Sequence, residues 1–133
     1  MTSARTSIST LPGGHQFPPA TFTLSADGVE AYMRATGDAG AYGAAAPPLA
    51  AVAFGLAALQ QRIALPEGSL HTGQEVEHSA PVPVGAALTL TGRIAQRSER
   101  QGYVVSVIEF EIAAGPQVAV RARTTIMAPG GGE

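Results

Sequence analysis

The second half of the chain alternates apolar and polar residues, which predicts antiparallel strands. Residues 86–94, 103–112 and 118–126 each place apolar side chains at every second position, the period of a strand with one buried face. Turn-forming residues at 97–102 and 114–116 separate these segments. The three strands therefore form a predicted meander.

Two finer features of this predicted sheet bear on chemistry. Residues 71–79 are expected to form a further strand, in which alternation places His71, Gly73, Glu75 and Glu77 on one face. A turn centred near Gly115 would set Glu109 roughly opposite Arg121, where opposite charges help to fix the register.

The first half of the chain changes to helical spacing. Ser25 is a suitable N-cap for a helix over 26–35, and Gly37 would end it. A longer helix is expected from Pro48 to Ile63, because apolar residues recur there at three- and four-residue spacing. Alanines and Phe54 fill the positions between them, so this helix is predicted to be buried all round and wrapped by a curved sheet.

These elements predict one domain of the α+β class. A length of 133 residues suits a single domain. Residues 1–19 are rich in Ser, Thr, Gly and Pro and are expected to form a flexible tail, with a short strand at 21–24 starting the order. The domain is placed at 20–129, and 130–133 form a short C-terminal tail.

Composition limits both the core and the chemistry. Hydrophobic residues make up 45% of the chain, about 60 residues, and 25 of them are alanine, which leaves 35 larger apolar side chains. Cys and Lys are absent. Disulfides, thiolate nucleophiles, Cys-ligated zinc, Schiff bases and a P-loop lysine are therefore excluded.

Net charge and hydropathy limit the classes of partner that the chain could bind. The net charge is −2 and the eight arginines are scattered, so no nucleic-acid footprint is present. The apolar stretch 44–59 is interrupted by prolines and is shorter than the roughly 20 residues that span a membrane. Because the N-terminus has no apolar signal region, a cytoplasmic location is expected.

Few residues are left that could carry chemistry. His15 lies in the expected tail and is interpreted as solvated. Asp38 lies in a glycine-rich loop, where it could be catalytic or could simply tighten a turn. His71 and Glu75 could share a strand face as an acid/base pair, or belong to a polar edge strand at a subunit boundary. The histidines show no metal-ligand spacing, so no metal is predicted. No other cofactor is expected.

Several motifs in this order resemble a known family. FTLSADGVEAYMRATGD, APPLAAVAF, LHTGQEVEHSAPVPVGAALTLTGRI, RQGYVVSVIEFEI and VAVRARTTIM are similar to the N-terminal-type MaoC dehydratase domains, relatives of the fatty-acid-synthase dehydratase domain. The resemblance covers about residues 20–128. It implies a hotdog fold, in which an antiparallel sheet wraps one long helix. It also implies thioester substrates carried on CoA or acyl carrier protein, with hydration of a trans-2-enoyl group or the reverse dehydration.

The resemblance also assigns residues. Asp38 matches the family's catalytic Asp, but Gly43 stands where the active members carry His. In the family, backbone N–H groups at the start of the long helix polarise the thioester carbonyl, and the resemblance places that helix start near Pro47, Pro48 and Leu49. Tyr42, Phe54 and Gly73 are the further residues expected to contact substrate.

Because the histidine is missing, three functions remain open. The chain could be a non-catalytic subunit paired with a complete hotdog partner, or a homodimeric enzyme in which His71 replaces the base. It could also be a thioesterase or acyl-binding module that uses Asp38 or Glu75. In each case a dimer is expected, either with a copy of itself or with a second hotdog subunit, because a hotdog sheet normally continues across a two-fold axis.

Overall fold

The computed structural model describes residues 6–38, 40 and 45–130, and for Pro48 the backbone alone. It contains two α-helices, one 3-10 helix and seven strands within this part of the chain. In chain order they are β1 (Thr6–Ser7), η1 (Ile8–Thr10), β2 (Gln16–Thr23), α1 (Ala26–Thr36), α2 (Pro48–Gln60), β3 (Ile63–Ala64), β4 (Leu70–His78), β5 (Ala87–Arg100), β6 (Tyr103–Ala114) and β7 (Gln117–Pro129).

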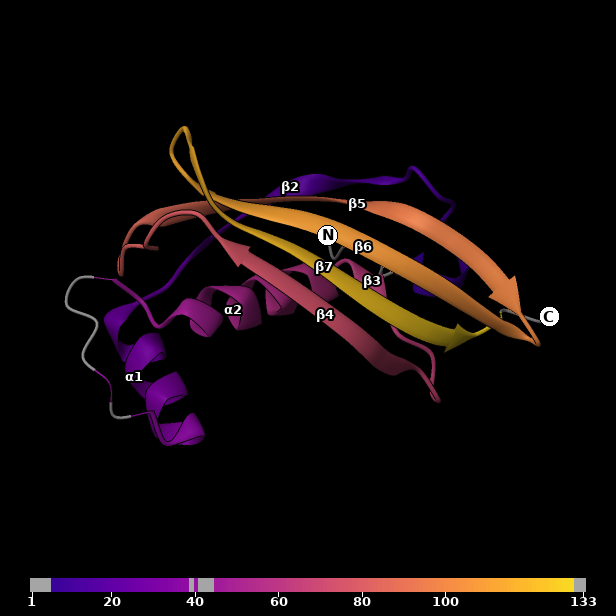
Figure 1. The fold of residues 1–133 in the computed structure, drawn as a ribbon, viewed down its shortest axis with the longest axis horizontal. Helices are drawn as coiled ribbons and strands as arrows, with labels where there is room; N and C mark the ends of the chain where they lie inside the picture. Colours follow the sequence, from indigo (N-terminus) through magenta and orange to yellow (C-terminus); the bar gives the residue numbers. More distant parts are fainter. Residues whose placement is uncertain (1–5, 39, 41–44, 131–133) are drawn as a thin grey trace, which may run out of the picture.

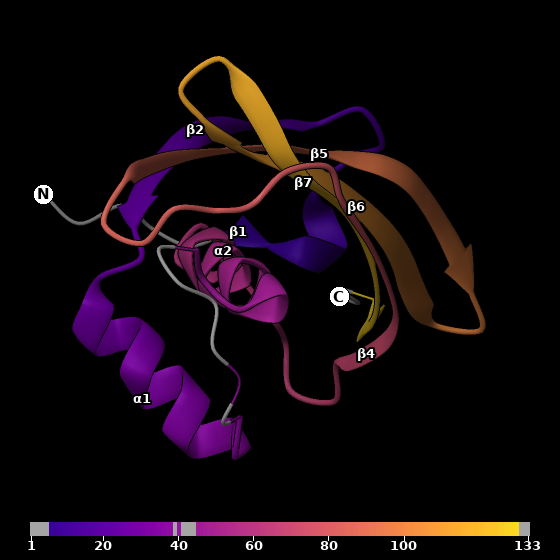
Figure 2. The ribbon, with the colours of Figure 1, turned by 60° about the vertical axis from the view of Figure 1, so that its left-hand side comes forward.

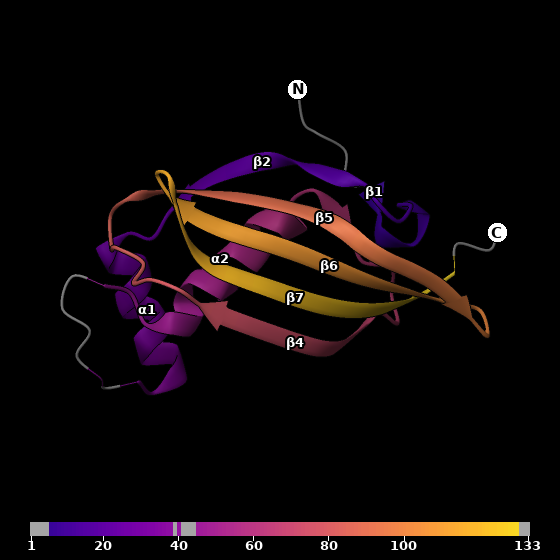
Figure 3. The same cartoon turned by 45° about the horizontal axis from the view of Figure 1, so that its top comes forward.

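One curved antiparallel sheet and the helix α2 make up the body of the molecule. The sheet has five strands in the order β2-β5-β6-β7-β4, so β2 and β4 are its edges (Figure 3). Its concave face covers α2, and α1 lies outside this layer near the start of α2 (Figure 1). The expected architecture, a sheet wrapped around one long helix, is confirmed.

The three predicted meander strands are present and extend further than expected. The predicted turn at 97–102 is wrong in length, because β5 continues to Arg100 and β6 starts at Tyr103. Only Gln101 and Gly102 form the turn, with φ of 51° and 85°. Positive φ at both central residues is the geometry whose twist matches that of the flanking strands, so a two-residue turn suffices.

The second hairpin has a different register from the expected one. Glu109 pairs with Arg123, and Arg121 pairs with Glu111. The register shifts between Ile112 and Ala113, at a bulge that inserts one residue into β7. Opposite charges therefore do face each other across β6 and β7, but the predicted pairing of Glu109 with Arg121 is wrong.

Both ends of α1 agree with their sequence signals. The Oγ of Ser25 accepts a hydrogen bond from the Gly28 N–H at 3.0 Å, which satisfies a first-turn donor. Gly37 ends the helix in the left-handed conformation, with φ of 71°. The two ends of this helix thus lie where the local sequence predicts them.

The expectation that α2 is buried all round is wrong for one side of the helix. Ala50 and Ala51 are fully buried against the sheet, whereas Leu49 is 57% exposed. Ala53, Ala57 and Gln60 follow Leu49 at helical spacing and are exposed as well. In Figure 2, α1 and β4 flank the side of α2 that the sheet leaves uncovered. An apolar stripe on α2 therefore has no cover within the described chain.

The prediction of a flexible tail over 1–19 is wrong from residue 6 onward. Ile8, Leu11 and Phe17 belong to the hydrophobic core, and β2 begins at Gln16. The segment lacks periodicity because its few apolar residues enter the core singly from irregular backbone. Two prolines fit in β2 because it is an edge strand whose register shifts between Phe17 and Ala20.

Two further sequence predictions can be set against the structure. Strand β7 ends at Pro129, where the domain was expected to end, and residues 131–133 lie outside the described part of the chain. Neither helix described here has the length and apolar content needed to cross a membrane.

Candidate functional site

A cavity of about 620 Å³ lies between α1 and the segment that leads into α2. Its described lining is mostly apolar and comes from α1, from the approach to α2 and from the segment before β5: Ala26, Val29, Glu30, Met33, Arg34, Asp38, Ala45, Pro47 and Val84. A backbone bridge holds two of these parts together, since Ala46 N–H donates to the Val82 carbonyl at 2.8 Å. This cavity is the candidate site because it contains both Asp38 and the start of α2.

Asp38 is placed by the end of α1. Its backbone N–H donates to the Met33 carbonyl at 2.8 Å, directly after the left-handed Gly37. Its Oδ1 accepts a hydrogen bond from the Gly40 N–H, also at 2.8 Å. Asp38 thus tightens a glycine-rich turn, as one sequence interpretation held, and it lines the cavity as the other required.

The first turn of α2 opens beside the same cavity. Pro47 is its N-cap residue and is buried in the cavity wall, and no side chain caps this helix end. Pro48 is the first helical residue. Pro47 and Pro48 have no N–H, and the Ala50 N–H donates to the Pro47 carbonyl at 3.0 Å, so this end has few free donors. The helix dipole still favours an oxygen that carries negative charge there. Leu49 is exposed and is not part of the described cavity lining.

The structure places only one of the aromatic residues expected to contact substrate. Tyr42 and Gly43 lie outside the described residues. Phe54 joins the two helices, since its ring meets that of Tyr32 edge-on with centroids 6.5 Å apart. It is not among the described residues that line the cavity.

A bulge in β4 separates the proposed acid/base pair. His71 pairs with Ile126 and Gly73 pairs with Thr125, so Thr72 is an extra residue between them. One inserted residue moves the side chains before it to the opposite face of the sheet. The prediction that His71 and Glu75 share a face is therefore wrong.

His71 lines a separate cavity on the inner face of the sheet. This cavity of about 170 Å³ lies at the far end of α2, with Leu56, Leu59 and Ile63 in its wall. The His71 Nε2 is 3.0 Å from the Gly73 carbonyl oxygen. Because α2 has 13 residues, and a helix rises about 1.5 Å per residue, its two ends are about 20 Å apart. His71 and Asp38 are thus at opposite ends of the helix.

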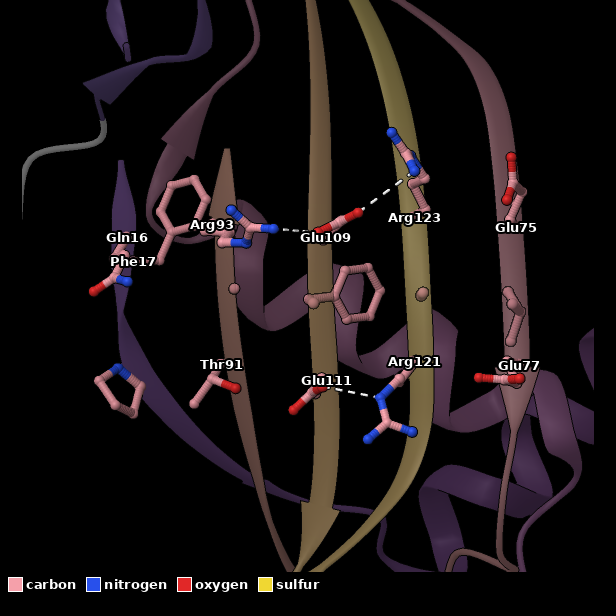
Figure 4. A pocket seen from close by; sticks show the side chains of 15 residues that line it. Gln16, Phe17, Glu75, Glu77, Thr91, Arg93, Glu109, Glu111, Arg121 and Arg123 are labelled. Carbon is pink, nitrogen blue, oxygen red and sulfur yellow. Dashed lines mark hydrogen bonds and ion pairs between the residues drawn. The ribbon is translucent and has the colours of Figure 1, made fainter. Parts of the chain in front are cut away.

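Glu75 points to a third place, the outer face of the sheet. An open groove of about 860 Å³ there is lined by charged residues of four strands, Glu75 and Glu77 among them (Figure 4). Gly73, on the same strand, is half-buried beside Thr125. The three residues expected to be catalytic therefore line three separate places in the single chain: Asp38 and His71 line two different cavities, and Glu75 lines the outer groove.

The cavity around Asp38 includes residues that sequence reasoning missed. Val29 and Met33 are one helical turn apart on α1 and face it together, a spacing that could have indicated them. Val84 comes from a loop, and no sequence signal marks it. Among the residues that the structure describes, no three His, Cys, Asp or Glu side chains are grouped so as to hold a metal ion.

Comparisons with known proteins concern the fold. No family model and no curated protein sequence matches the chain. The MaoC-like dehydratase from Rhodospirillum rubrum superposes with a TM-score of 0.76 at 14% identity, over 96% of this chain and 99% of that chain. The R-hydratase PhaJ1 from Pseudomonas aeruginosa gives a TM-score of 0.72 at 18% identity, over 94% and 86%.

A third solved structure is a complex of two different chains. The HadBC (3R-hydroxyacyl-ACP dehydratase) complex from Mycobacterium tuberculosis gives a TM-score of 0.71 at 18% identity, over 91% of this chain and 100% of the matched chain. All three superpositions span nearly the whole chain, and their sequence identity is low. The chain thus has the hotdog fold, in the form found in MaoC-like dehydratases and (R)-hydratases.

Proposed function

We propose that this chain is an acyl-thioester-binding hotdog subunit, related to the enoyl hydratases and 3-hydroxyacyl dehydratases, that does not complete hydration by itself. One observation carries the proposal: the cavity at the start of α2 contains Asp38, while His71 and Glu75 lie elsewhere. The site therefore has binding features and two carboxylates, Asp38 and Glu30. Glu30 lies 3.5 Å from Arg34 as an ion pair, and no histidine is among the described lining residues.

The cavity suits a thioester in two respects. Val29, Met33 and Val84 give it an apolar wall for an acyl chain. The positive end of the α2 dipole, with the Leu49 N–H, can stabilise charge that develops on the thioester carbonyl oxygen. CoA or acyl carrier protein would carry the substrate, and the chemistry requires no metal or other cofactor.

Hydration requires more than this set of groups. Water must lose a proton as its oxygen bonds to C3 of the enoyl group, and C2 must gain a proton. A carboxylate such as Asp38 can hold the water and accept one proton. Gly43, at the position where the resembling family carries His, supplies no group that could deliver the other.

A second hotdog chain would supply what is missing. The uncovered stripe on α2 and the free edge of β4 are surfaces that such a chain can bury. The structural match to one chain of a two-chain dehydratase complex supports this part of the proposal. We infer that the working unit is a dimer of hotdog domains.

The test compares binding with turnover. We expect isothermal titration to show that the purified chain binds a short trans-2-enoyl-CoA, and absorbance to show no hydration of it. Val84→Phe should narrow the cavity at its apolar wall and weaken binding at least tenfold, whereas Val105→Phe, on the outer face of β6, should leave binding unchanged. Lack of binding by the wild-type chain would overturn the proposal.

Turnover by the chain alone would select one of the other two functions. Rapid hydration that is lost in His71→Ala would show that His71 is a relocated base. Hydrolysis of a saturated acyl-CoA that is lost in Asp38→Asn would identify a thioesterase.

A further inference from the structure

The outer face of the sheet carries charges that alternate in sign from strand to strand. One row runs across all five strands at paired positions, from Gln16 through Arg93, Glu109 and Arg123 to Glu75. Figure 4 shows these side chains side by side across the sheet.

A second row lies next to the first and follows the same rule. Thr91 of β5 is followed by Glu111, Arg121 and Glu77 on β6, β7 and β4. In both rows the charge is negative on β6, positive on β7 and negative on β4. Each row therefore ends at the β4 edge with a carboxylate.

The arginines next to these two carboxylates already have ion-pair partners. Arg123 lies 3.5 Å from Glu109, and Arg121 lies 3.0 Å from Glu111, so both interact with β6. Within the described part of the chain, no ion pair joins either arginine to Glu75 or Glu77. The edge strand thus presents two carboxylates whose far side faces no further strand.

In the registers centred on residues 74–77, a copy of this chain fits that edge poorly. If β4 pairs antiparallel with its own copy about an axis at Val76, Glu75 of each chain lies opposite Glu77 of the other. If the axis passes through Glu75 or Glu77, that glutamate lies opposite the same glutamate of the other chain. If the axis passes through Gln74, the two Glu75 residues are diagonal neighbours. Like charges that are opposite or diagonal on one sheet face repel.

We propose that the β4 edge is built for a different hotdog chain, one whose edge strand carries arginine or lysine opposite Glu75 and Glu77. Such a strand extends both charge rows by the same alternation that the sheet already shows. It also brings a chain that can cover the apolar stripe of α2, which lies on the same side as β4 (Figure 2). The partner is thus identified by the charge on its edge strand.

The experiment uses charge-altered copies of the chain as probes, with dissociation constants measured by analytical ultracentrifugation. Glu75→Gln/Glu77→Gln should associate with itself at least tenfold more tightly than the wild-type chain does. Asp27→Asn/Glu99→Gln removes the same charge from exposed positions on α1 and β5 and should leave self-association unchanged. The wild-type chain mixed with Glu75→Arg/Glu77→Arg should form a one-to-one dimer at least tenfold tighter than its own.

Salt gives an independent readout of the same contact. Raising the salt concentration should weaken the mixed dimer and strengthen wild-type self-association, because screening acts on attraction and repulsion alike. Circular dichroism confirms that each variant is folded. The proposal is overturned if the wild-type chain dimerises as tightly as the glutamine variant. It is equally overturned if the mixture stays monomeric, in which case the two carboxylates only protect the edge from pairing.

This inference rests on the proposed function only in taking a second hotdog chain as the occupant of the edge. Selective assembly of the mixed dimer without thioester binding would overturn the function and keep the inference. A tight wild-type homodimer that binds the thioester would overturn the inference about the β4 edge and keep the proposal of thioester binding.

Discussion

At the scale of single residues, Ile8 shows how the N-terminal segment contributes to the fold. Its side chain is fully buried among the core residues. Ile8→Ala should lower the free energy of unfolding by about 2–5 kcal/mol, because the lost contacts leave a cavity. Urea unfolding followed by circular dichroism measures the change.

A neighbouring residue provides the control for Ile8. Thr10 is exposed and its hydroxyl donates only to the nearby Ser7 carbonyl, so Thr10→Ala should cost less than about 1 kcal/mol. Equal effects of the two substitutions would show that residues 6–11 are not part of the cooperative core.

The residue scale is also where the sequence predicts the site least well. Asp38 could be placed near the long helix because the end of α1 is readable from Gly37. The relation between His71 and Glu75 depends on a bulge at Thr72. Gly73 beside it signals a possible irregularity in the strand but does not show that a residue is inserted there. One inserted residue changes the face of the sheet on which a side chain lies. The hydrophobic alternation in β4 is too short to show where the residue is inserted.

At the scale of elements, the contact between α2 and the sheet depends on Gly55. A Cβ added there would lie 2.9 Å from the Ile112 Cδ1 and 3.2 Å from the Leu90 Cδ1. Gly55→Ala should gain up to about 1 kcal/mol of helix propensity and lose about 1–3 kcal/mol to overpacking. We therefore expect a net loss of stability of up to about 2 kcal/mol in thermal or urea unfolding.

A substitution on the other side of α2 separates packing from propensity. Ala57 is exposed, so Ala57→Ser should change the unfolding free energy by no more than about 0.5 kcal/mol. A stabilising effect of Gly55→Ala would mean that the two leucine and isoleucine methyl groups can move aside without cost.

The turn between β5 and β6 is an element that can be improved. Gln101 adopts φ of 51°, which is unfavourable for most residues other than glycine, asparagine and aspartate. Gln101→Asn creates the Asn-Gly pair preferred in two-residue hairpins and should stabilise the protein by about 0.5–1 kcal/mol. Gln96→Asn, at an exposed position within β5, should give no gain. Melting temperatures of the two variants decide the matter.

The elements differ in how far the sequence predicts them. Helix α1 and strands β5 to β7 follow from caps and alternation, because each signal lies within the element itself. The exposed stripe of α2 could not be predicted, since Ala53 and Ala57 have the same local signal as the buried Ala50 and Ala51. Which alanines the sheet covers is decided by tertiary packing alone.

At the scale of the whole molecule, that uncovered stripe should be a contact surface. Ala57→Glu places a charge in its middle, where covering it would require removing a carboxylate from water. Because the position is exposed in the single chain and both residues are good helix formers, the unfolding free energy of the monomer should change by no more than about 0.5 kcal/mol. The substitution should therefore weaken association with a partner chain much more than it lowers the stability of the monomer.

The measurement is the dissociation constant for Ala57→Glu mixed with Glu75→Arg/Glu77→Arg, which should exceed that of the wild-type chain with the same probe at least tenfold. Ala35→Glu, at an exposed position of α1, adds the same charge off the stripe and should leave this constant unchanged. If Ala57→Glu assembled as tightly as the wild-type chain, the contact between chains would consist of the β4 edge alone. The alanines on that side of α2 would then be exposed surface, and a partner could not complete the site at the start of the helix by covering them.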